Sequence, residues 1–306
     1  MAKPRELRRR IKSVENTRQI TKTMEMVATS RLKRAQDRVR AARPYAAALT
    51  EVISNLYSPE LIDLFPLLRR PKGKPSRVAL ILITSNRGLC GAFNGNLIRM
   101  ARERLADYAA DGVAVELRVA VELHGIGRKG IGYFKYVGQE LASARDDIGD
   151  RPKADHAAEI MEPLMERFQV GELDVVEVIF AKFNSPLSTP PRVLPILPVT
   201  PPSTGGTEAG AADRTSRRGT VNFLLKPSAE EIVGAILPLY IRNSMYRALA
   251  ETAASEHGAR RTAMKSATDN AGEMLDRLRR TYNRARQAVI TQELAEIVGG
   301  AEALKG

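Results

Sequence analysis

The start of the chain places an apolar or small residue at alternating steps of three and four along one long stretch. The positions of this N-terminal seam are Leu7, Ile11, Val14, Thr21, Met24, Ala28, Leu32, Ala35, Val39, Ala42, Ala46, Leu49, Ile53 and Leu56. This spacing is typical of the buried side of a helix in a coiled coil. About fifty residues of helix reach roughly 75 Å, farther than a small domain is wide, so the seam needs a helical partner.

A second seam of the same period lies near the other end of the chain. A helix-like stretch runs from Ala229 to Val298 and is stopped by Gly299 and Gly300. Its predicted seam positions are Met264, Ala267, Ala271, Met274, Leu278, Thr281, Ala285 and Ala288. Because both patterns call for a long partner, we expect the two helices to pair with each other, antiparallel.

Two residues of the first pattern are irregular. Arg18 falls on the seam between Val14 and Thr21, and Pro44 lies inside the predicted helix. A proline inside a helix removes one backbone hydrogen bond and clashes with the preceding turn. We therefore expect Pro44 to kink this helix or to end its first part.

The middle of the chain alternates strand-like and helix-like stretches. Strands are predicted at Arg77–Thr84, Val113–Val121, Val175–Phe183, "PRVLPILPV" and "VNFLLK", and helices at Asn94–Ala110 and Ala154–Gln169. Such alternation indicates an open α/β (Rossmann-like) sheet. The sequence thus predicts an N-terminal coiled-coil helix at 1–57, an inserted α/β domain at 75–225 and a C-terminal coiled-coil helix at 228–306. A Pro-, Gly- and Ser-rich mobile loop is expected at about 198–220.

The charge of the chain narrows the kind of partner. The net charge is +13, and residues 1–57 hold 14 Lys and Arg against 5 Asp and Glu. This excess indicates an acidic partner: nucleic acid, an anionic membrane surface or an acidic protein. The single cysteine, Cys90, excludes an internal disulfide, and three scattered histidines give no metal-binding pattern. No apolar run is long enough for a membrane span or a secretory signal.

One glycine motif requires a separate interpretation. In "HGIGRKGIGYF", the residues Gly125, Gly127 and Gly130 spell the G-x-G-x-x-G of a dinucleotide-binding loop. However, the motif follows the second predicted strand, whereas the fingerprint normally follows the first. Only about two turns of helix fit before Gly138, which is short for a helix that binds a pyrophosphate. We interpret these glycines as a structural turn between strand and helix and expect no cofactor.

Four long stretches together resemble a known family. They are "SVENTRQITKTMEMVATSRLKRAQ", "SNRGLCGAFN", "SEHGARRTAMKSATDNAGEM" and "NRARQAVITQELAEIVGGAEAL", and they bracket nearly the whole chain. In their residues and in their order along the chain, they resemble the gamma subunit of the bacterial F-type ATP synthase. The resemblance implies a rotor shaft inside a ring of alternating alpha and beta subunits, with an α/β foot that binds the epsilon subunit and the membrane c-ring.

The resemblance also implies a function and a location. Ion flow would turn the c-ring and the shaft, and the asymmetric shaft would drive each beta subunit through its catalytic states. Catalysis would belong to beta, and this chain would supply coupling. Contact with the membrane would come only through the c-ring. With no presequence ahead of the matching region, the expected location is the cytoplasmic face of a bacterial plasma membrane.

Individual site residues follow from the same resemblance. Lys22, Met24 and Met26 match a contact with an acidic loop of beta; Arg286, Gln287 and Thr291 match a hydrogen-bonded catch on beta; Leu294, Ile297 and Val298 match the axle tip in an apolar sleeve. Arg128 and Lys129 are possible contacts for another rotor subunit. From spacing alone, Met24 is a seam residue and the catch residues are a solvated helix face. The chain departs from many members at Asn86, where they carry aspartate.

Two other functional classes remain as alternatives. The first is a basic coiled-coil protein that binds nucleic acid through its N-terminal helix, with an affinity that falls steeply with salt. Aromatic residues make up only 5% of the chain, and its basic residues form no recognisable reading motif, so nucleic acid is not the expected partner. The second is a dinucleotide-dependent oxidoreductase, which rests only on Gly125 to Gly130.

Overall fold

The chain folds into two compact units that share two long helices. The computed structural model describes residues 4–56, 64–69, 71, 73, 75–114, 119–200 and 229–303. One unit comprises residues 1–30 and 260–306, and the other comprises residues 31–259. Helices α1 (Pro4–Leu56) and α6 (Ala229–Ala303) contribute to both units. The expected stop at Gly299 and Gly300 was wrong, because α6 continues through both glycines to Ala303. The predicted strand "VNFLLK" and nearly all of the predicted loop at 198–220 lie outside the described residues.

The larger unit contains a five-stranded sheet in the order β3-β2-β1-β4-β5. The strands are β1 (Arg77–Ile83), β2 (Ala120–Ile126), β3 (Ser143–Arg145), β4 (Val175–Ala181) and β5 (Pro191–Leu197). The first four are parallel, and β5 is antiparallel to β4. The remaining elements are η1 (Pro66–Leu68), α3 (Phe93–Ala114), α4 (Arg128–Val137) and α5 (Ala154–Gln169). The predicted α/β fold class is confirmed.

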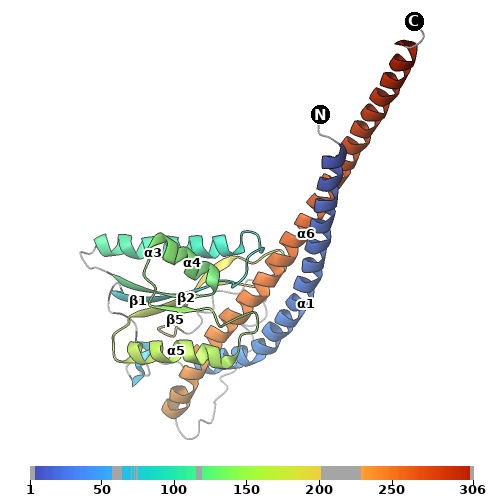
Figure 1. Cartoon of the computed structure of the whole chain (residues 1–306). Helices are drawn as coiled ribbons and strands as arrows, with labels where there is room; N and C mark the ends of the chain where they lie inside the picture. The colour runs from blue at the N-terminus through green and yellow to red at the C-terminus, as the bar shows by residue number, and fades with distance from the viewer. Residues whose placement is uncertain are drawn as a thin grey trace, which may run out of the picture. The chain divides into compact units, whose positions relative to one another are not determined.

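The sheet is covered on both faces, which explains the continuous apolar run of β1. All residues from Val78 to Ile83 are buried. Ala79, Ile81 and Ile83 pack with apolar residues of α5 and α6, whereas Leu80 and Leu82 pack with α3 and α4. Figure 1 shows α3 and α4 on one side of the sheet and α5 on the other. A strand buried on both faces reads as a run of Val, Ile and Leu rather than as an alternation.

The predicted second strand was wrong in its position. The sequence indicated Val113–Val121, but α3 continues to Ala114 and β2 begins at Ala120. The alternating apolar pattern extends through Leu123, so it fits either register equally well. Pairing decides the position, because β2 aligns with β1 from Arg77 opposite Ala120 onward. The short edge strand β3 was not predicted, since its three residues carry no apolar pattern.

A carboxylate before β4 fixes the starts of two neighbouring strands. The Asp174 carboxylate accepts hydrogen bonds from the backbone amides of Ser76 and Arg77, both at 2.9 Å, and from the Ser76 hydroxyl at 2.8 Å. Burial alone would raise the pKa of Asp174, but these hydrogen bonds outweigh it and the net pKa is lowered. The ionised carboxylate therefore stabilises the fold.

We expect Asp174→Asn to lower the unfolding free energy at pH 7 by about 2 kcal/mol, because a charged acceptor becomes a weaker neutral one. A folded-state pKa below the unfolded value gives stability above about pH 4 that is lost as the pH falls through the folded pKa. The difference from wild type should therefore shrink in acid. Denaturant unfolding across pH measures it. Glu172→Gln, at an exposed carboxylate, serves as the control and should cost less than about 1 kcal/mol; a deficit that persists in acid would contradict the argument.

The smaller unit is an antiparallel pair of helices. The hydroxyls of Thr21 and Thr268 lie in hydrogen-bond contact at 2.8 Å, and the Arg279 guanidinium donates to Glu15 at 2.9 Å. The predicted pairing of the two terminal helices is therefore present. Arg18 stays exposed although it falls on the seam, and its guanidinium lies over Gly272, where no side chain blocks it.

Burial confirms most of the N-terminal seam. The buried members are Leu7, Ala28, Leu32, Ala35, Val39, Ala46, Leu49 and Ile53. Helix α1 continues through Pro44, so the proline does not end it. Of the expected positions, only the side chain of Leu56 lies outside the described part.

The C-terminal seam was wrong at alternate positions. Met274 is 53% exposed, whereas its neighbour Leu275 is only 1% exposed. Thr281 and Ala288 are also exposed, while Tyr282 is partly buried. A seam with steps of three then four and a seam with steps of four then three have every seventh residue in common. The two seams differ only in the residue that lies between these shared positions. Which intermediate residue is buried depends on the side from which the partner helix approaches.

Candidate functional site

The turn between β2 and α4 has the strand, glycine and helix arrangement of a phosphate loop, but its amides are already used. The amide of Arg128 donates to the Asn86 side-chain oxygen at 2.9 Å, and that of Lys129 to the Ser85 carbonyl at 3.2 Å. The Gly130 amide donates to the Thr84 hydroxyl at 2.9 Å. A bound phosphate needs these first-turn amides. In this fold, the segment after β1 accepts the hydrogen bonds that a phosphate would accept.

The glycines of the motif permit this close approach. Gly127 has φ 93°, and a Cβ on it would collide with the backbone carbonyl of Thr84. A Cβ on Gly130 would lie 2.9 Å from the Thr84 side chain. The interpretation as a structural turn therefore has a specific cause: the glycines let the end of β1 pack against the start of α4.

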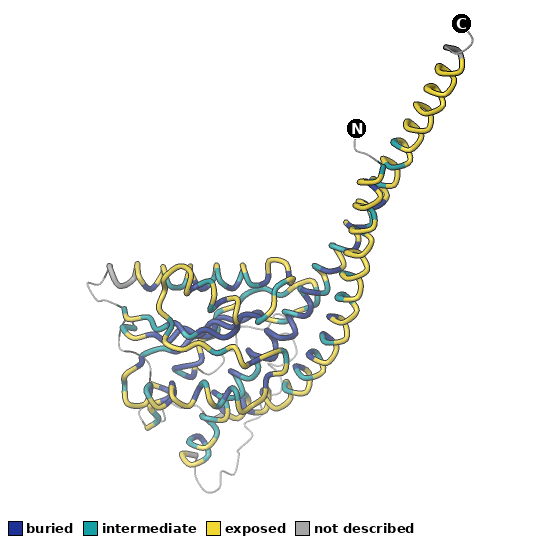
Figure 2. Tube along the Cα trace, in the orientation of Figure 1, coloured by how far each residue is buried: buried dark blue, intermediate teal, exposed yellow. Residues whose placement is uncertain are grey.

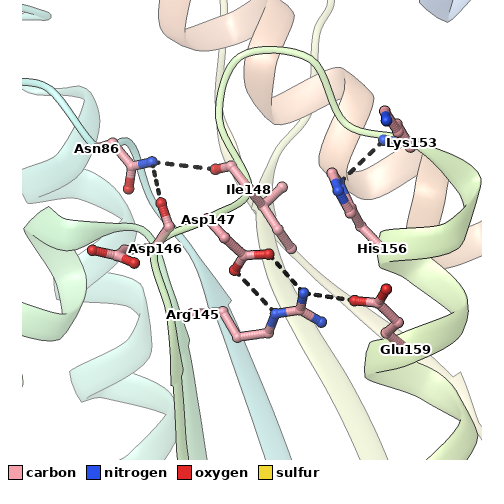
Figure 3. A network of polar contacts seen from close by, with 8 residues as sticks. All are labelled: Asn86, Arg145, Asp146, Asp147, Ile148, Lys153, His156 and Glu159. Carbon is pink, nitrogen blue, oxygen red and sulfur yellow. Dashed lines mark hydrogen bonds and ion pairs between the residues drawn. The ribbon is translucent and has the colours of Figure 1, made fainter.

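A polar network joins the loops at the carboxyl ends of β1 and β3, as Figure 3 shows. The Asn86 amide donates to the Asp146 carbonyl at 2.8 Å and to the Ile148 carbonyl at 3.3 Å. Arg145 donates to Asp147 at 2.7 Å and to Glu159 of α5 at 2.6 Å. Its hydrogen bonds lower the pKa of Asp147. No sequence pattern indicated this network, because Asn86 lies 60 residues from Asp146 along the chain.

Asn86 has a role that aspartate could not fill in this arrangement. Its side-chain oxygen accepts from Arg128 while its nitrogen donates to two carbonyls. A carboxylate could accept in the same way but has no hydrogen to donate. An aspartate at this position would therefore lack the two donated hydrogen bonds.

Of the two candidate rotor contacts, one is already paired within the chain. The Arg128 guanidinium donates to Asp146 at 2.9 Å, although its side chain is 69% exposed. The Lys129 side chain lies beside Gly88, where an added Cβ would come within 3.6 Å of it. The Arg128 side chain therefore borders the loop after β3, and the Lys129 side chain borders the loop after β1.

The predicted catch and axle-tip residues share one face of α6. Every residue from Arg286 to Ala301 is exposed, as the end of the helix in Figure 2 shows. At 100° per residue, the six positions span a sector of about 140°. This tip face consists of Arg286, Gln287, Thr291, Leu294, Ile297 and Val298. The helix thus places hydrogen-bonding groups and apolar groups in one continuous stripe.

The tip extends past the start of its partner helix. In the two contacts between α1 and α6, at Thr21 and at Glu15, the paired residue numbers add to about 290. Since both helices rise about 1.5 Å per residue, Pro4 lies level with roughly residue 286. The apolar side chains of Leu294, Ile297 and Val298 are 58%, 68% and 63% exposed. Within this unit, α1 therefore leaves them uncovered.

The three candidate residues on α1 do not lie together. Lys22 and Met26 are exposed, whereas Met24 is partly buried as the seam spacing predicts. Sequence reasoning missed Ile20 and Val27, which are 59% and 48% exposed, and Ile290 on the tip face, 47% exposed. Their signal was available: Ile20 and Val27 are apolar residues seven apart that lie off the seam.

The described ranges contain neither a candidate membrane span nor a candidate metal cluster. No helix there is long and apolar enough to cross a bilayer. No group of three or more His, Cys, Asp or Glu residues there could hold a metal ion.

The fold and these surfaces define a class: an α/β domain with long, paired terminal helices, whose exposed faces suit protein partners. A family model described as ATP synthase matches residues 3–304. The ATP synthase gamma chain of Gemmatimonas aurantiaca is 58% identical over 306 residues and all of both chains. That of Leptospira biflexa is 42% identical over 304 residues, covering 99% of this chain and 100% of its own. The chain belongs to the ATP synthase gamma chain family.

Solved structures agree with the fold. A chain of the Euglena gracilis mitochondrial ATP synthase, in a structure titled OSCP/F1/c-ring, has a TM-score of 0.66 at 19% identity and covers 98% of this chain and 94% of its own. A chain from the central stalk and c-ring of the Tetrahymena thermophila enzyme has a TM-score of 0.57 at 23% identity, over 81% and 99%. At these identities the likeness concerns the fold.

Proposed function

We propose that this chain is the central rotor shaft of an F-type ATP synthase, which couples ion-driven rotation of a c-ring to the catalytic cycle of the beta subunits. The observation that carries this proposal is the exposed tip of α6, which extends past its partner helix and holds a polar and apolar stripe on one face. Exposed apolar side chains in such a stripe are expected to meet a partner.

The parts of the chain have separate roles in this proposal. The coiled coil, from residues 1–57 and 228–306, reaches into the ring of alpha and beta subunits. The α/β foot, residues 75–225, binds the epsilon subunit and the c-ring, with Arg128 and Lys129 at the rotor contact. The chain is non-catalytic and meets the membrane only through the c-ring, on the cytoplasmic face of a bacterial plasma membrane.

Contacts with the stator follow from charge and exposure. Lys22 and Met26 are exposed on α1, beside a strongly basic helix surface, which suits an acidic loop of beta. Met24 supports them from its partly buried position. Arg286, Gln287 and Thr291 offer hydrogen bonds to beta, and Leu294, Ile297 and Val298 fit an apolar sleeve.

The test of the function is reconstitution. The alpha and beta subunits are assembled with and without this chain, together with the other subunits in membranes, and ATP-driven proton pumping and ATP hydrolysis are measured. We expect pumping only when the chain is present. Equal pumping in its absence would overturn the proposal.

The catch on beta makes a separate prediction. We expect the combined change Arg286→Ala, Gln287→Ala and Thr291→Ala to lower the rate of ATP hydrolysis by the assembled complex about tenfold or more. Each lost interfacial hydrogen bond is worth about 1 kcal/mol, and about 1.4 kcal/mol is a tenfold change. Gln292→Ala, on the opposite face of the same helix, serves as the matched control and should leave the rate unchanged. An equal loss of hydrolysis in both variants would contradict a specific role of the tip face.

A further inference from the structure

One segment of α6 is enclosed on every side. Eight consecutive residues, from Ala248 to Ser255, are buried, and His257 and Gly258 continue the burial. An amphipathic surface helix buries one stripe, whereas a helix buried all round lies inside a core. This enclosed segment contains Glu251, Thr252 and Ser255, three polar residues that a core helix would not need for packing alone.

These polar residues form hydrogen bonds with the backbone at the end of β4. The Ala181 amide donates to the Thr252 hydroxyl at 3.3 Å, and the Ser255 hydroxyl donates to the Ala181 carbonyl at 3.1 Å. Two residues further on, the Phe183 amide donates to Glu251 at 3.3 Å. Ala181 is only 1% exposed, so α6 satisfies backbone groups of β4 that water cannot reach.

Other parts of the larger unit close the enclosure. Ala35 and Val39 of α1 form a buried cluster with Ala250 and Ala254. At Gly258, an added Cβ would lie 3.3 Å from the Pro186 backbone. The small side chains thus let α6 pass between α1 and the loop after β4.

A loop carboxylate ties both helices to the α/β domain beside this enclosure. Asp150 accepts from the Arg31 guanidinium of α1 at 2.8 Å and lies 3.4 Å from the His257 ring nitrogen of α6. Burial would raise the pKa of Asp150, but the charge of Arg31, followed by the neighbouring His257 ring, outweighs it and the net pKa is lowered. The carboxylate is therefore ionised at neutral pH.

These hydrogen bonds between α6 and β4 lie at the point of the sheet where other α/β domains bind ligands. Strand β2 lies on one side of β1 in the sheet, and β4 lies on the other side of β1. The topological switch point is therefore between β1 and β4. In open α/β sheets, ligands bind at the carboxyl ends of the strands at that point. Here the carboxyl end of β4 is bonded to α6 instead. The location that serves a small ligand in other such domains holds a helix of this chain.

We infer that Glu251, Thr252 and Ser255 are positioning residues that clasp α6 to the carboxyl end of β4, and that torque passes between the α/β domain and the long helix through this clasp. The inference rests on the proposed rotor function. A rotor made of a sheet domain and a helix transmits torque only if the helix cannot turn or slide within the domain. Helix–helix packing of small residues resists sliding weakly, whereas directional hydrogen bonds to the sheet backbone fix both the rotation and the height of the helix.

The first test measures the clasp in the isolated full chain. In the variant Thr252→Val with Ser255→Ala, side-chain volume is nearly kept and both hydroxyl contacts to Ala181 are lost. We expect hydrogen exchange at the amides of Ala181 and Phe183 to speed up about tenfold. The single variant Thr252→Ser, which keeps a hydroxyl at this position, should retain most of the protection of these amides from exchange. Unchanged exchange in the double variant would overturn the clasp.

The second test measures coupling in the assembled complex. We expect the double variant to keep ATP hydrolysis but to lose proton pumping per ATP, and a bead attached to the α/β domain to show wider angular fluctuation. Phe134→Leu, in the core between the sheet and α4, weakens the packing of the domain but leaves the hydrogen bonds between α6 and β4 in place, and it should keep pumping. Double-variant pumping equal to that of Phe134→Leu would overturn the clasp. Failure of the wild-type complex to pump would instead overturn the rotor function.

Discussion

Replacing Gly127 with alanine should lower the unfolding free energy of the α/β domain by about 4 kcal/mol or more, a large fraction of the stability of a typical domain. Two costs add. A residue with a side chain is strained at φ 93°. The new Cβ would also collide with the backbone carbonyl of Thr84, which is held by the parallel strands and cannot move aside as a flexible side chain would. Denaturant unfolding followed by circular dichroism measures the loss.

A glycine five residues later provides the control. Gly132 lies within α4 and has open space around the position of a Cβ. Gly132→Ala should stabilise the helix by about 0.5–1 kcal/mol, because alanine loses less backbone entropy on folding. If the two substitutions had similar effects, the close packing of Gly127 on the end of β1 would not be the reason for the glycine.

Removal of the Arg104 side chain should cost about 3–5 kcal/mol, because it leaves a buried carboxylate without its positive partner. Glu177 lies in β4 and is only 5% exposed. Arg104 of α3 donates two hydrogen bonds to it, at 2.7 and 2.8 Å, and also donates to the Tyr108 hydroxyl at 3.1 Å. Burial, followed by the charge of Glu177, raises the pKa of Tyr108, so the phenol stays neutral as an acceptor.

Two comparisons make this prediction specific. Arg102→Ala, at an exposed position of the same helix, should change the unfolding free energy by less than about 0.5 kcal/mol. The paired change Arg104→Met with Glu177→Leu removes both charges and should recover most of the loss, because neither charge is then buried alone. A double variant as unstable as Arg104→Ala would show that packing, rather than the unpaired carboxylate, carries the cost.

The candidate site was only partly accessible to sequence reasoning. Sequence reasoning named six exposed residues of the tip face on α6 but missed Ile290 on the same face, and the role of this face in binding beta stays a prediction. The three residues on α1 could not be separated in the same way, because Met24 has both the seam spacing and the matching motif. Burial assigns Met24 to the seam side and leaves Lys22 and Met26 exposed.

The clasp on β4 had no sequence signal. Thr252 and Ser255 are ordinary residues of a long helical pattern, and their partner, Ala181, is about seventy positions away along the chain. Local periodicity reports which face of a helix is apolar, and it carries no information about which distant backbone groups that face will meet. The same limit applies to the network of Asn86, Arg145 and Glu159.

The sequence by itself determined the two long helices, the alternation of strands and helices between them, and the family. These properties depend on local periodicity and on motifs that can be read one stretch at a time. The tertiary structure decided the register of β2, the burial of Leu275 in place of Met274, and the use of the G-x-G-x-x-G amides by the segment after β1. In each case the local pattern was compatible with two solutions, and the choice came from a partner brought close only by folding.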